Sequence, residues 1–285
     1  MRFHFVGTFP PEYTSALAEL LPLLKVTIDT NGIPVTVCHG ARLCVQGNGT
    51  AYQITWCTPA SFYRALALLC CHHTESPLHI AETPCFDSCG VMLDCSRNAV
   101  STVDGVKNIL RRMALMGLNL AMMYTEDTYE IQGRPYFGYL RGAYTQVELK
   151  ELDDYAHLFG IEMMPCIQTL AHLERALQWS CMQEYRDTDD VLMVGEEATY
   201  ALISEMIAAA CAPFRSRRVH IGMDEAYWLG RGAHWDQYGA QTHAQLMKTH
   251  LARVHAILNE QGLSAMMWSD MHFTAANPGG GIYHP

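Results

Sequence analysis

From residue 90 onward, the chain repeats a pattern in which a short apolar run is followed at once by polar residues. Within the runs the apolar positions are continuous rather than alternating, and amphipathic segments separate one run from the next. Continuous apolar strands alternating with helices predict a parallel sheet covered on both faces. The runs and the polar residues that end them are 91–93 with Asp94, 118–124 with Thr125, Glu126 and Asp127, 161–167 with Gln168, 219–223 with Asp224 and Glu225, and 265–268 with Ser269 and Asp270.

The segments between these runs carry signals for helix starts and stops. Thr102 is placed to cap a helix that has one apolar face. Thr145 and Glu148 have the spacing of a capping box, and Gly160 ends that helix just before the next apolar run. Two further helices are predicted, from about 196 to 211 and from about 242 to 262.

The first 84 residues have a different rhythm. Residues 35–37 and 52–56 alternate like strands, whereas 61–70 has the pattern of a helix. This mixture predicts a small α+β domain over 1–84, followed by a larger domain over 85–285.

Chemically active side chains recur at the carboxyl ends of the predicted strands, which is where a (β/α)8 barrel carries its active site. Five strand–helix units can be recognised, and a closed barrel needs three more. Two α/β folds therefore remain open: an open doubly wound sheet, and a (β/α)8 TIM-type barrel that is incomplete at its C-terminal end.

Composition narrows the class of protein. Of the 285 residues, 49% are apolar and 17% are charged, which is typical of a globular chain with a sizeable core. A net charge of −10 without a basic stripe argues against a nucleic-acid partner, and no apolar run approaches the length of a membrane span. We find no signal-peptide pattern after Met1, so we expect a cytoplasmic protein whose eleven cysteines are reduced.

The run Cys70, Cys71, His72 and His73 has the residue types of a metal cluster. Adjacent residues on a helix point in different directions, and the paired spacing of a structural zinc site is absent. We expect this run to be the end of a helix rather than a metal site.

Asp224 and Glu225 are two neighbouring carboxylates at the end of an apolar run. Side chains alternate along a regular strand, so the two acids would face opposite ways. Both can reach one cleft only where the strand breaks into its loop, and Gly222 allows a bend or a close backbone approach. There, burial and a like-charged neighbour can keep one acid protonated while the other stays ionised.

The segment from His220 to Glu225 resembles the His-x-Gly-x-Asp-Glu signature of glycoside hydrolase family 20, the β-N-acetylhexosaminidases. The resemblance runs in order over residues 90–272 and is closest to the cytosolic, hexosaminidase D-like branch. It implies a (β/α)8 barrel preceded by a small domain, and it favours the incomplete barrel over the open sheet. Segments 91–98, 124–127, 141–145 and 165–174 resemble the first barrel strand, the second strand, the approach to the second barrel helix, and the third strand with its histidine loop.

This resemblance implies a retaining exo-β-N-acetylhexosaminidase that acts by substrate assistance. The 2-acetamido oxygen of a terminal N-acetylglucosamine or N-acetylgalactosamine attacks the anomeric carbon and forms an oxazolinium intermediate. Glu225 is implied to protonate the leaving oxygen and later to deprotonate water. Asp224 is implied to orient the acetamido N–H and to stabilise its positive charge. Neither acid has to be the nucleophile, so neighbours in sequence can serve.

The resemblance extends to residues around the acids. Asp127 and His172 match a supporting pair, and Trp268 matches a tryptophan that packs around the acetamido methyl group. From the residues alone, His172 is as well explained as a helix-capping or core histidine, and Trp268 as a core aromatic. His220 is expected to be a hydrogen-bonded support inside its strand. Tyr129 and Asp270 are candidates for the rim of the pocket.

Two departures from the family pattern concern recognition of the sugar hydroxyls, and so the choice between gluco and galacto substrates. Residues 86–90 lack an arginine that many members carry before the first strand, and Gln168 stands where an acid is common.

Two competing hypotheses are an inactive or sugar-binding fragment, and a metal-dependent hydrolase using His172, His220 and Asp224. The latter is disfavoured because no His-x-His opens the first strand. We expect a glycan or glycoside as small-molecule partner and no metal or cofactor; the oligomeric state is open.

Overall fold

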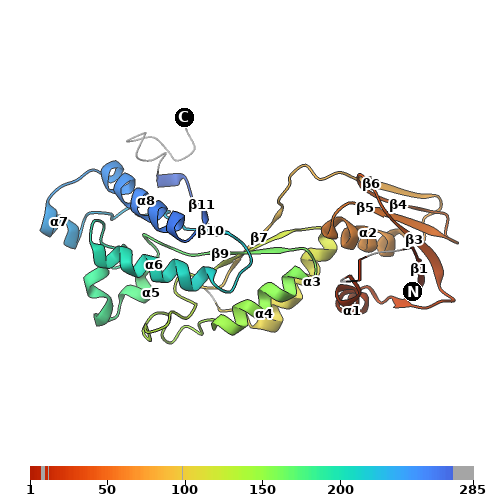
Figure 1. Cartoon of the computed structure of the whole chain (residues 1–285), viewed down its shortest axis with the longest axis horizontal. Helices are drawn as coiled ribbons and strands as arrows, with labels where there is room; N and C mark the ends of the chain where they lie inside the picture. The colour runs from red at the N-terminus through yellow and green to blue at the C-terminus, as the bar shows by residue number, and fades with distance from the viewer. Residues whose placement is uncertain (8–9, 12, 98, 272–285) are drawn as a thin grey trace. The chain divides into compact units, whose positions relative to one another are not determined.

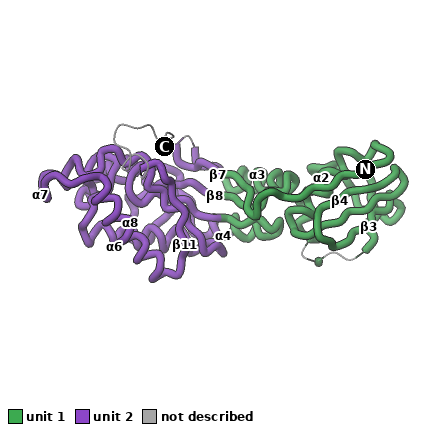
Figure 2. Tube along the Cα trace, turned by 90° about the horizontal axis from the view of Figure 1, so that it is seen from above, with its two compact units in different colours: residues 1–91, 102–121, 151–163 green, residues 92–101, 122–150, 164–285 purple. Residues whose placement is uncertain are grey.

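The computed structural model describes residues 1–7, 10, 11, 13–97 and 99–271. The order of helices and strands can be followed in Figure 1. The chain forms two compact units, residues 1–91, 102–121 and 151–163 in one, and residues 92–101, 122–150 and 164–285 in the other (Figure 2). The domain boundary expected near residue 84 falls inside the first unit and stays a prediction.

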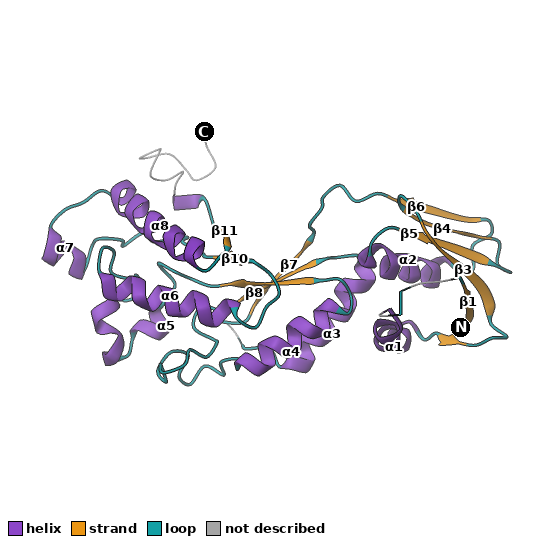
Figure 3. Cartoon of the chain, in the orientation of Figure 1, coloured by secondary structure: helices purple, strands orange, loops and turns teal. Residues whose placement is uncertain are grey.

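The first unit contains a six-stranded mixed sheet with the order β2-β1-β3-β5-β4-β6 (Figure 3). Strand β4 pairs antiparallel with β5 and β6, whereas the other pairs are parallel. Two helices accompany it, α1 (Tyr13–Leu24) and α2 (Pro59–His72). The strands are β1 (Arg2–Val6), β2 (Thr27–Ile28), β3 (Ile33–His39), β4 (Leu43–Gly47), β5 (Tyr52–Trp56) and β6 (Leu78–Glu82).

The alternation seen in the sequence explains the two central strands. In β3, Val35 and Val37 are buried while Thr36 between them is exposed. Helix α2 begins at a capping box formed by Thr58 and Ser61, and it buries Phe62 and its apolar neighbours. The predicted strands at 35–37 and 52–56 and the predicted helix at 61–70 are therefore present.

Two helices that follow later in the chain also belong to this unit, α3 (Val103–Met116) and the end of α4 (Gln146–His157). The hydroxyl of Tyr63 donates to the carbonyl of Leu158 at 3.1 Å. The Arg111 guanidinium donates to Glu19 at 3.0 Å and to the Tyr155 hydroxyl at 2.8 Å. These contacts fasten α3 and α4 to α1 and α2.

The second sheet has five strands in the order of the sequence, β11-β10-β9-β8-β7. Strands β9, β10 and β11 pair in parallel. Helices α3, α4, α6 (Glu197–Cys211) and α8 (His243–Glu260) alternate with the strands, as expected for an α/β fold. The strands are β7 (Gly90–Asp94), β8 (Leu120–Tyr124), β9 (Glu162–Cys166), β10 (Arg218–His220) and β11 (Ser264–Met266); shorter helices are α5 (Glu174–Leu177), η1 (Ser180–Tyr185) and α7 (Ala233–Tyr238).

The predicted helix boundaries are found. Thr102 Oγ1 accepts from the Gly105 N–H at 3.1 Å. Thr145 and Glu148 form both hydrogen bonds of a capping box, at 3.2 Å and 2.9 Å. Thr242 caps α8, and Gly160 follows α4 in a left-handed conformation with φ of 67°.

Strand β10 ends earlier than its apolar run predicts. The run covers 219–223, but the strand ends at His220. Gly222, Met223 and Glu225 then adopt positive φ angles of 70°, 69° and 50°. A Cβ on Gly222 would lie 1.9 Å from Gln168 Oε1, so only glycine fits at this turn. This left-handed turn places the two acids.

Candidate active site

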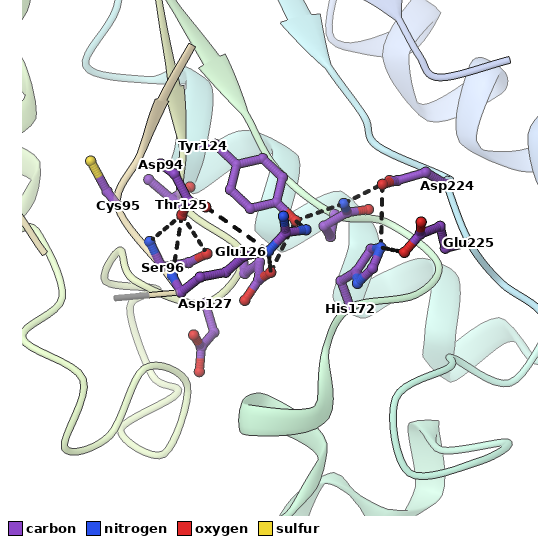
Figure 4. A network of polar contacts seen from close by, with 12 residues as sticks. Asp94, Cys95, Ser96, Tyr124, Thr125, Glu126, Asp127, His172, Asp224 and Glu225 are labelled. Atoms are coloured by element: carbon purple, nitrogen blue, oxygen red, sulfur yellow. Dashed lines mark hydrogen bonds and ion pairs between the residues drawn. The ribbon is translucent and has the colours of Figure 1, made fainter. Parts of the chain in front are cut away.

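The site lies where β7, β8, β9 and β10 end, within the second unit, and it is built from the loops that follow these strands (Figure 4). Residues 94–97 come from the end of β7, 125–127 from β8, 168–172 from β9 and 224–225 from β10. This is the strand-end position at which the sequence predicts chemistry.

Asp224 and Glu225 converge on the ring of His172. His172 Nε2 lies 3.2 Å from Asp224 Oδ2 and 3.6 Å from Glu225 Oε2. The ring N–H is not aligned for a hydrogen bond with either oxygen, so these are ion-pair contacts when the ring is protonated. The positive φ of Met223 and Glu225 breaks the strand alternation that would separate the acids. The backbone of Glu225 is held by its N–H, which donates to Asp270 Oδ2 at 3.0 Å.

The two acids lie in different surroundings. The Asp224 side chain is 17% exposed and the Glu225 side chain is 56% exposed. Burial raises the pKa of Asp224, but the interactions with His172 and Gln168 outweigh burial and bring the pKa below its usual value. The interaction with Asp224 in turn raises the pKa of His172, and burial offsets this only in part. Asp224 is thus held as an anion beside an imidazole that is easily protonated.

Gln168 connects the acids to the end of β8. Its side chain is fully buried, and its Nε2 donates to Asp224 Oδ1 at 2.8 Å and to the Tyr124 hydroxyl at 3.0 Å. Its Oε1 accepts from the Met223 N–H at 3.3 Å. The Tyr124 hydroxyl donates to Glu126 Oε1 at 2.9 Å. Asp224 and Glu126 are therefore joined through two buried polar side chains.

Two arginines face the acids that follow β8. Arg97 donates to the Tyr124 hydroxyl at 3.1 Å, and its Nε lies 3.6 Å from Glu126 Oε1. Arg141 Nη2 lies 3.4 Å from Asp127 Oδ1 and 3.9 Å from Glu126 Oε2. Glu126 and Asp127 thus have guanidinium partners, whereas His172 faces Asp224 and Glu225.

The structure does not bring Asp127 and His172 together as the expected supporting pair. Asp127 is almost fully buried and pairs with Arg141, which is itself anchored by donating to the Ser96 carbonyl at 2.6 Å. Burial raises the pKa of Asp127, and Arg141 opposes this shift. In Figure 4 the Asp127 carboxylate points away from His172. An anchored guanidinium holds Asp127, and His172 turns to the acids after β10.

His220 and Trp268 brace the turn beneath the acids. His220 is buried in β10, and its Nδ1 accepts from the Gly222 N–H at 3.2 Å. Burial lowers the pKa of His220, so the ring is kept neutral with its proton on Nε2. The centroid of the Trp268 ring lies 4.7 Å from that of the His220 ring, and the backbone N–H of Trp268 donates to the Gly222 carbonyl at 3.1 Å. The ring of Trp268 remains partly exposed.

Tyr129 lies in the core rather than at the rim where the sequence suggests it. It is 1% exposed, and its ring meets Phe137 edge-on at 5.2 Å. A bridge between Tyr129 and Tyr144 draws this part of the loop inward. The other rim candidate, Asp270, is partly exposed and accepts the backbone N–H of Glu225.

Sequence reasoning assigned no catalytic or supporting role to several residues of this network. The available signal was position, because four of the five lie at or within a few residues of a predicted strand end, whereas Arg141 lies in the loop before α4. Their pairing could not be read from the sequence, since it depends on which loops meet. These residues are Arg97, Tyr124, Glu126, Arg141 and Gln168.

The run from Cys70 to His73 ends helix α2, as predicted. His72 Nδ1 lies 2.8 Å from Glu75, and His73 Nδ1 lies 3.0 Å from the Cys70 carbonyl. Within the described residues, no group of three or more His, Cys, Asp and Glu side chains is arranged to hold a metal ion.

All eleven cysteines are described, and all are free thiols. No helix in the described ranges is long and apolar enough to cross a membrane.

Solved structures share this fold. A family 20 β-N-acetylhexosaminidase from Streptomyces coelicolor A3(2) superposes with a TM-score of 0.75 at 20% identity, over 97% of this chain and 63% of that one. A family 20 exo-β-N-acetylglucosaminidase from Vibrio harveyi, solved with N-acetylglucosamine, gives 0.73 at 18% identity, over 93% and 51%. At these identities the likeness establishes the α/β fold.

Sequence relatives and a family model lead to the same family. Hexosaminidase D from Bos taurus is 29% identical over 170 residues, which are 55% of this chain and 48% of that protein. Hexosaminidase D from Homo sapiens is 26% identical over 184 residues, 61% of this chain and 38% of that protein. The chain thus spans half or less of these relatives. The model of glycosyl hydrolase family 20, catalytic domain, matches residues 86–280, and the chain belongs to this family.

Proposed function

We propose that the protein is a retaining exo-β-N-acetylhexosaminidase that removes terminal N-acetylglucosamine or N-acetylgalactosamine with assistance from the substrate's acetamido group. One observation carries the proposal: sequence neighbours Asp224 and Glu225 converge on one imidazole nitrogen, at 3.2 Å and 3.6 Å. Two side-by-side acids suit a reaction in which neither is the nucleophile. Membership of family 20 and the similarity to hexosaminidase D support the glycosidase class.

In the first step, the acetamido oxygen attacks the anomeric carbon while the bond to the leaving oxygen breaks. The new C–O bond closes an oxazolinium ring, and positive charge develops on the acetamido nitrogen. Asp224 is suited to accept the acetamido N–H and to stabilise that charge, because it is buried and held as an anion.

Glu225 is proposed to donate the proton that the leaving oxygen takes up. In the second step it removes a proton from water, which attacks the anomeric carbon and reopens the ring with net retention. Its exposure suits a group that must meet leaving group and water in turn. His172, within ion-pair distance of both acids, is proposed to balance their charge as the Glu225 proton moves.

The remaining predicted residues are proposed to shape the pocket. Trp268 presents a partly exposed ring, braced by His220, to the acetamido methyl group. Asp270 holds the backbone of Glu225. Asp127 is proposed to act indirectly, through its ion pair with Arg141 after the end of β8. Tyr129 is proposed to act only through packing.

We propose further that the five-stranded sheet belongs to a (β/α)8 barrel domain over 85–285, preceded by a small α+β domain over 1–84. The family 20 structural neighbours and the sequential order of β7 to β11 support this organisation. A cytoplasmic location remains part of the proposal, in keeping with the similarity to hexosaminidase D.

Hydrolysis of aryl glycosides tests the function. The protein should release the aryl group from an N-acetyl-β-glucosaminide or N-acetyl-β-galactosaminide, and leave the corresponding plain β-glucoside intact. Equal rates with and without the 2-acetamido group would refute assistance by the substrate. Stabilisation by N-acetylglucosamine without any turnover would favour the sugar-binding alternative. Loss of activity with a chelator would point to the metal-dependent alternative.

A further inference from the structure

Gln168 and Tyr124 form a buried polar bridge between the acids of two different strand ends. On one side Gln168 Nε2 donates to Asp224 Oδ1 at 2.8 Å. On the other it donates to the Tyr124 hydroxyl at 3.0 Å, and that hydroxyl donates to Glu126 Oε1 at 2.9 Å. Both side chains of the bridge thus have hydrogen-bond partners on each side.

The direction of the bridge follows from its side bonds. Gln168 Oε1 accepts from the Met223 N–H at 3.3 Å, so the amide NH2 must face Asp224 and Tyr124. The Tyr124 oxygen accepts from both Gln168 and Arg97, which directs its own proton to Glu126. Both ends of the bridge are therefore carboxyl oxygens that accept hydrogen bonds.

The glutamine cannot turn away from this arrangement. It is 0% exposed, and the turn at Gly222 packs directly on its amide. A Cβ at Gly222 would lie 1.9 Å from Gln168 Oε1 and 2.5 Å from Cδ. An amide fixed by packing and by three hydrogen bonds presents its N–H to Asp224 in a single geometry.

We propose that Gln168 is a positioning residue that orients Asp224 and keeps it ionised, and that Tyr124 couples this function to the Arg97–Glu126 pair. The importance of Gln168 for turnover rests on the function proposed above, whereas the effect of Gln168 on Asp224 does not. A glutamine suits this place because it donates without titrating. A carboxylic acid there would have to share a proton with Asp224.

Other charged or titratable groups also face Asp224, so the test must isolate the glutamine. They are His172 and Glu225 at the ion-pair cluster, His220 from the same strand β10, Cys166 from the neighbouring strand β9, and Tyr227 from the following loop, with Arg97 and Glu126 beyond Tyr124. Substitutions at Gln168 and Tyr124 keep all of these side chains in place; Tyr124→Phe also removes the hydrogen bonds of the Tyr124 hydroxyl with Arg97 and Glu126.

The experiment is a pH titration of the Asp224 carboxyl carbon by NMR, in protein labelled with 13C at aspartate and assigned with Asp224→Asn. Gln168→Met removes the donor at similar volume and should raise the apparent pKa of Asp224 by about one pH unit. Gln168→Glu should raise it further, because a like charge is added. Tyr124→Phe should give a smaller rise, since only the far end of the bridge is lost.

Gln261→Glu is the matched control, because Gln261 Nε2 also donates twice, to the Ser204 carbonyl at 3.1 Å and hydroxyl at 3.2 Å, outside the Asp224 network. This control should leave the Asp224 titration unchanged. An unchanged titration in Gln168→Met would overturn the proposal. If the buried charge of Gln168→Glu prevents folding, the neutral variants Gln168→Met and Tyr124→Phe still test the proposal.

The titration requires no substrate, so it separates this inference from the proposed function. If the protein is active, the acid limb of the pH profile of kcat/KM should shift to higher pH in Gln168→Met, together with the Asp224 titration. If the protein is inactive but Gln168→Met still raises the apparent pKa of Asp224, the proposed function is refuted and the proposed role of Gln168 stands.

Discussion

Two strand ends in this protein carry a pair of adjacent acids, and the two pairs have different partners. Glu126 and Asp127 follow β8, and Asp224 and Glu225 follow β10. The first pair faces arginines, with Arg97 at 3.6 Å from Glu126 and Arg141 at 3.4 Å from Asp127. At the second pair, His172 and the neutral Gln168 take the place of arginines.

We propose that this difference separates a structural pair, which follows β8, from a catalytic pair, which follows β10. A guanidinium stays charged at every pH that the fold survives, so the acids after β8 have fixed partners. An imidazole titrates near neutrality, so the charge beside Asp224 and Glu225 can change as a proton moves. The pair that the sequence singled out for chemistry is the one with the titratable partner. Its likeness to the β8 pair is limited to sequence.

The largest expected effect comes from replacing the exposed acid. Glu225→Gln should lower kcat on an N-acetyl-β-glucosaminide by about 10²- to 10⁴-fold, the usual contribution of a general acid–base group. The matched change Glu126→Gln should lower it by about tenfold or less, the size of one weakened hydrogen bond. Steady-state kinetics on both variants, with circular dichroism to confirm folding, checks the contrast. Equal losses would show that the two pairs do not differ in role.

The next effect is on stability at the arginine-held pair. Arg141→Met leaves the buried Asp127 without its cation and should lower the free energy of unfolding by about 3 kcal/mol at neutral pH. The loss should shrink in acid, because burial raises the pKa of Asp127 and protonation removes the unpaired charge. Urea unfolding at two pH values measures it.

Arg97→Met is the control for Arg141→Met. The Arg97 side chain is 53% exposed, so its loss should cost about 1 kcal/mol or less. A cost for Arg97 as large as that for Arg141 would contradict the assignment of the buried pair to Arg141.

The smallest effect is the pH dependence of the histidine contact. The pKa of His172 is raised in the fold, so its contribution to stability is fully present below the unfolded pKa and lost as pH rises through the folded one. The pKa of Asp224 is lowered, so its contribution is lost only as pH falls through that lower value. His172→Gln should therefore cost about 1 kcal/mol near pH 5 and little near pH 9. A cost that grows with pH would contradict the ion pair.

The sequence predicted the frame of this fold because its signals are local. Apolar runs predicted β7 to β11 in order, and Thr102, Thr145 and Gly160 fixed helix ends through contacts within one turn. Strands β1, β2, β4 and β6 and helix α1 were not individually predicted; of these, β2 has only two residues, too few to show a period.

The site was predicted in part. The acid pair and its need for a broken strand followed from Asp224, Glu225 and Gly222. The partner of His172 could not be predicted in this way. It depends on where Arg141, which holds Asp127, is anchored, and on the left-handed turn at Met223. Tyr129 was misplaced because an aromatic residue after a strand suits rim and core equally.

The most direct test of the account is the rate on aryl glycosides whose N-acetyl group carries zero to three fluorines. Fluorine withdraws electrons from the acetamido oxygen and weakens it as a nucleophile, without altering either acid of the protein. If the sugar supplies the attacking oxygen beside Asp224 and Glu225, kcat should fall steeply with each fluorine. A kcat that is indifferent to fluorination would contradict the account, because a different nucleophile would then be forming the bond.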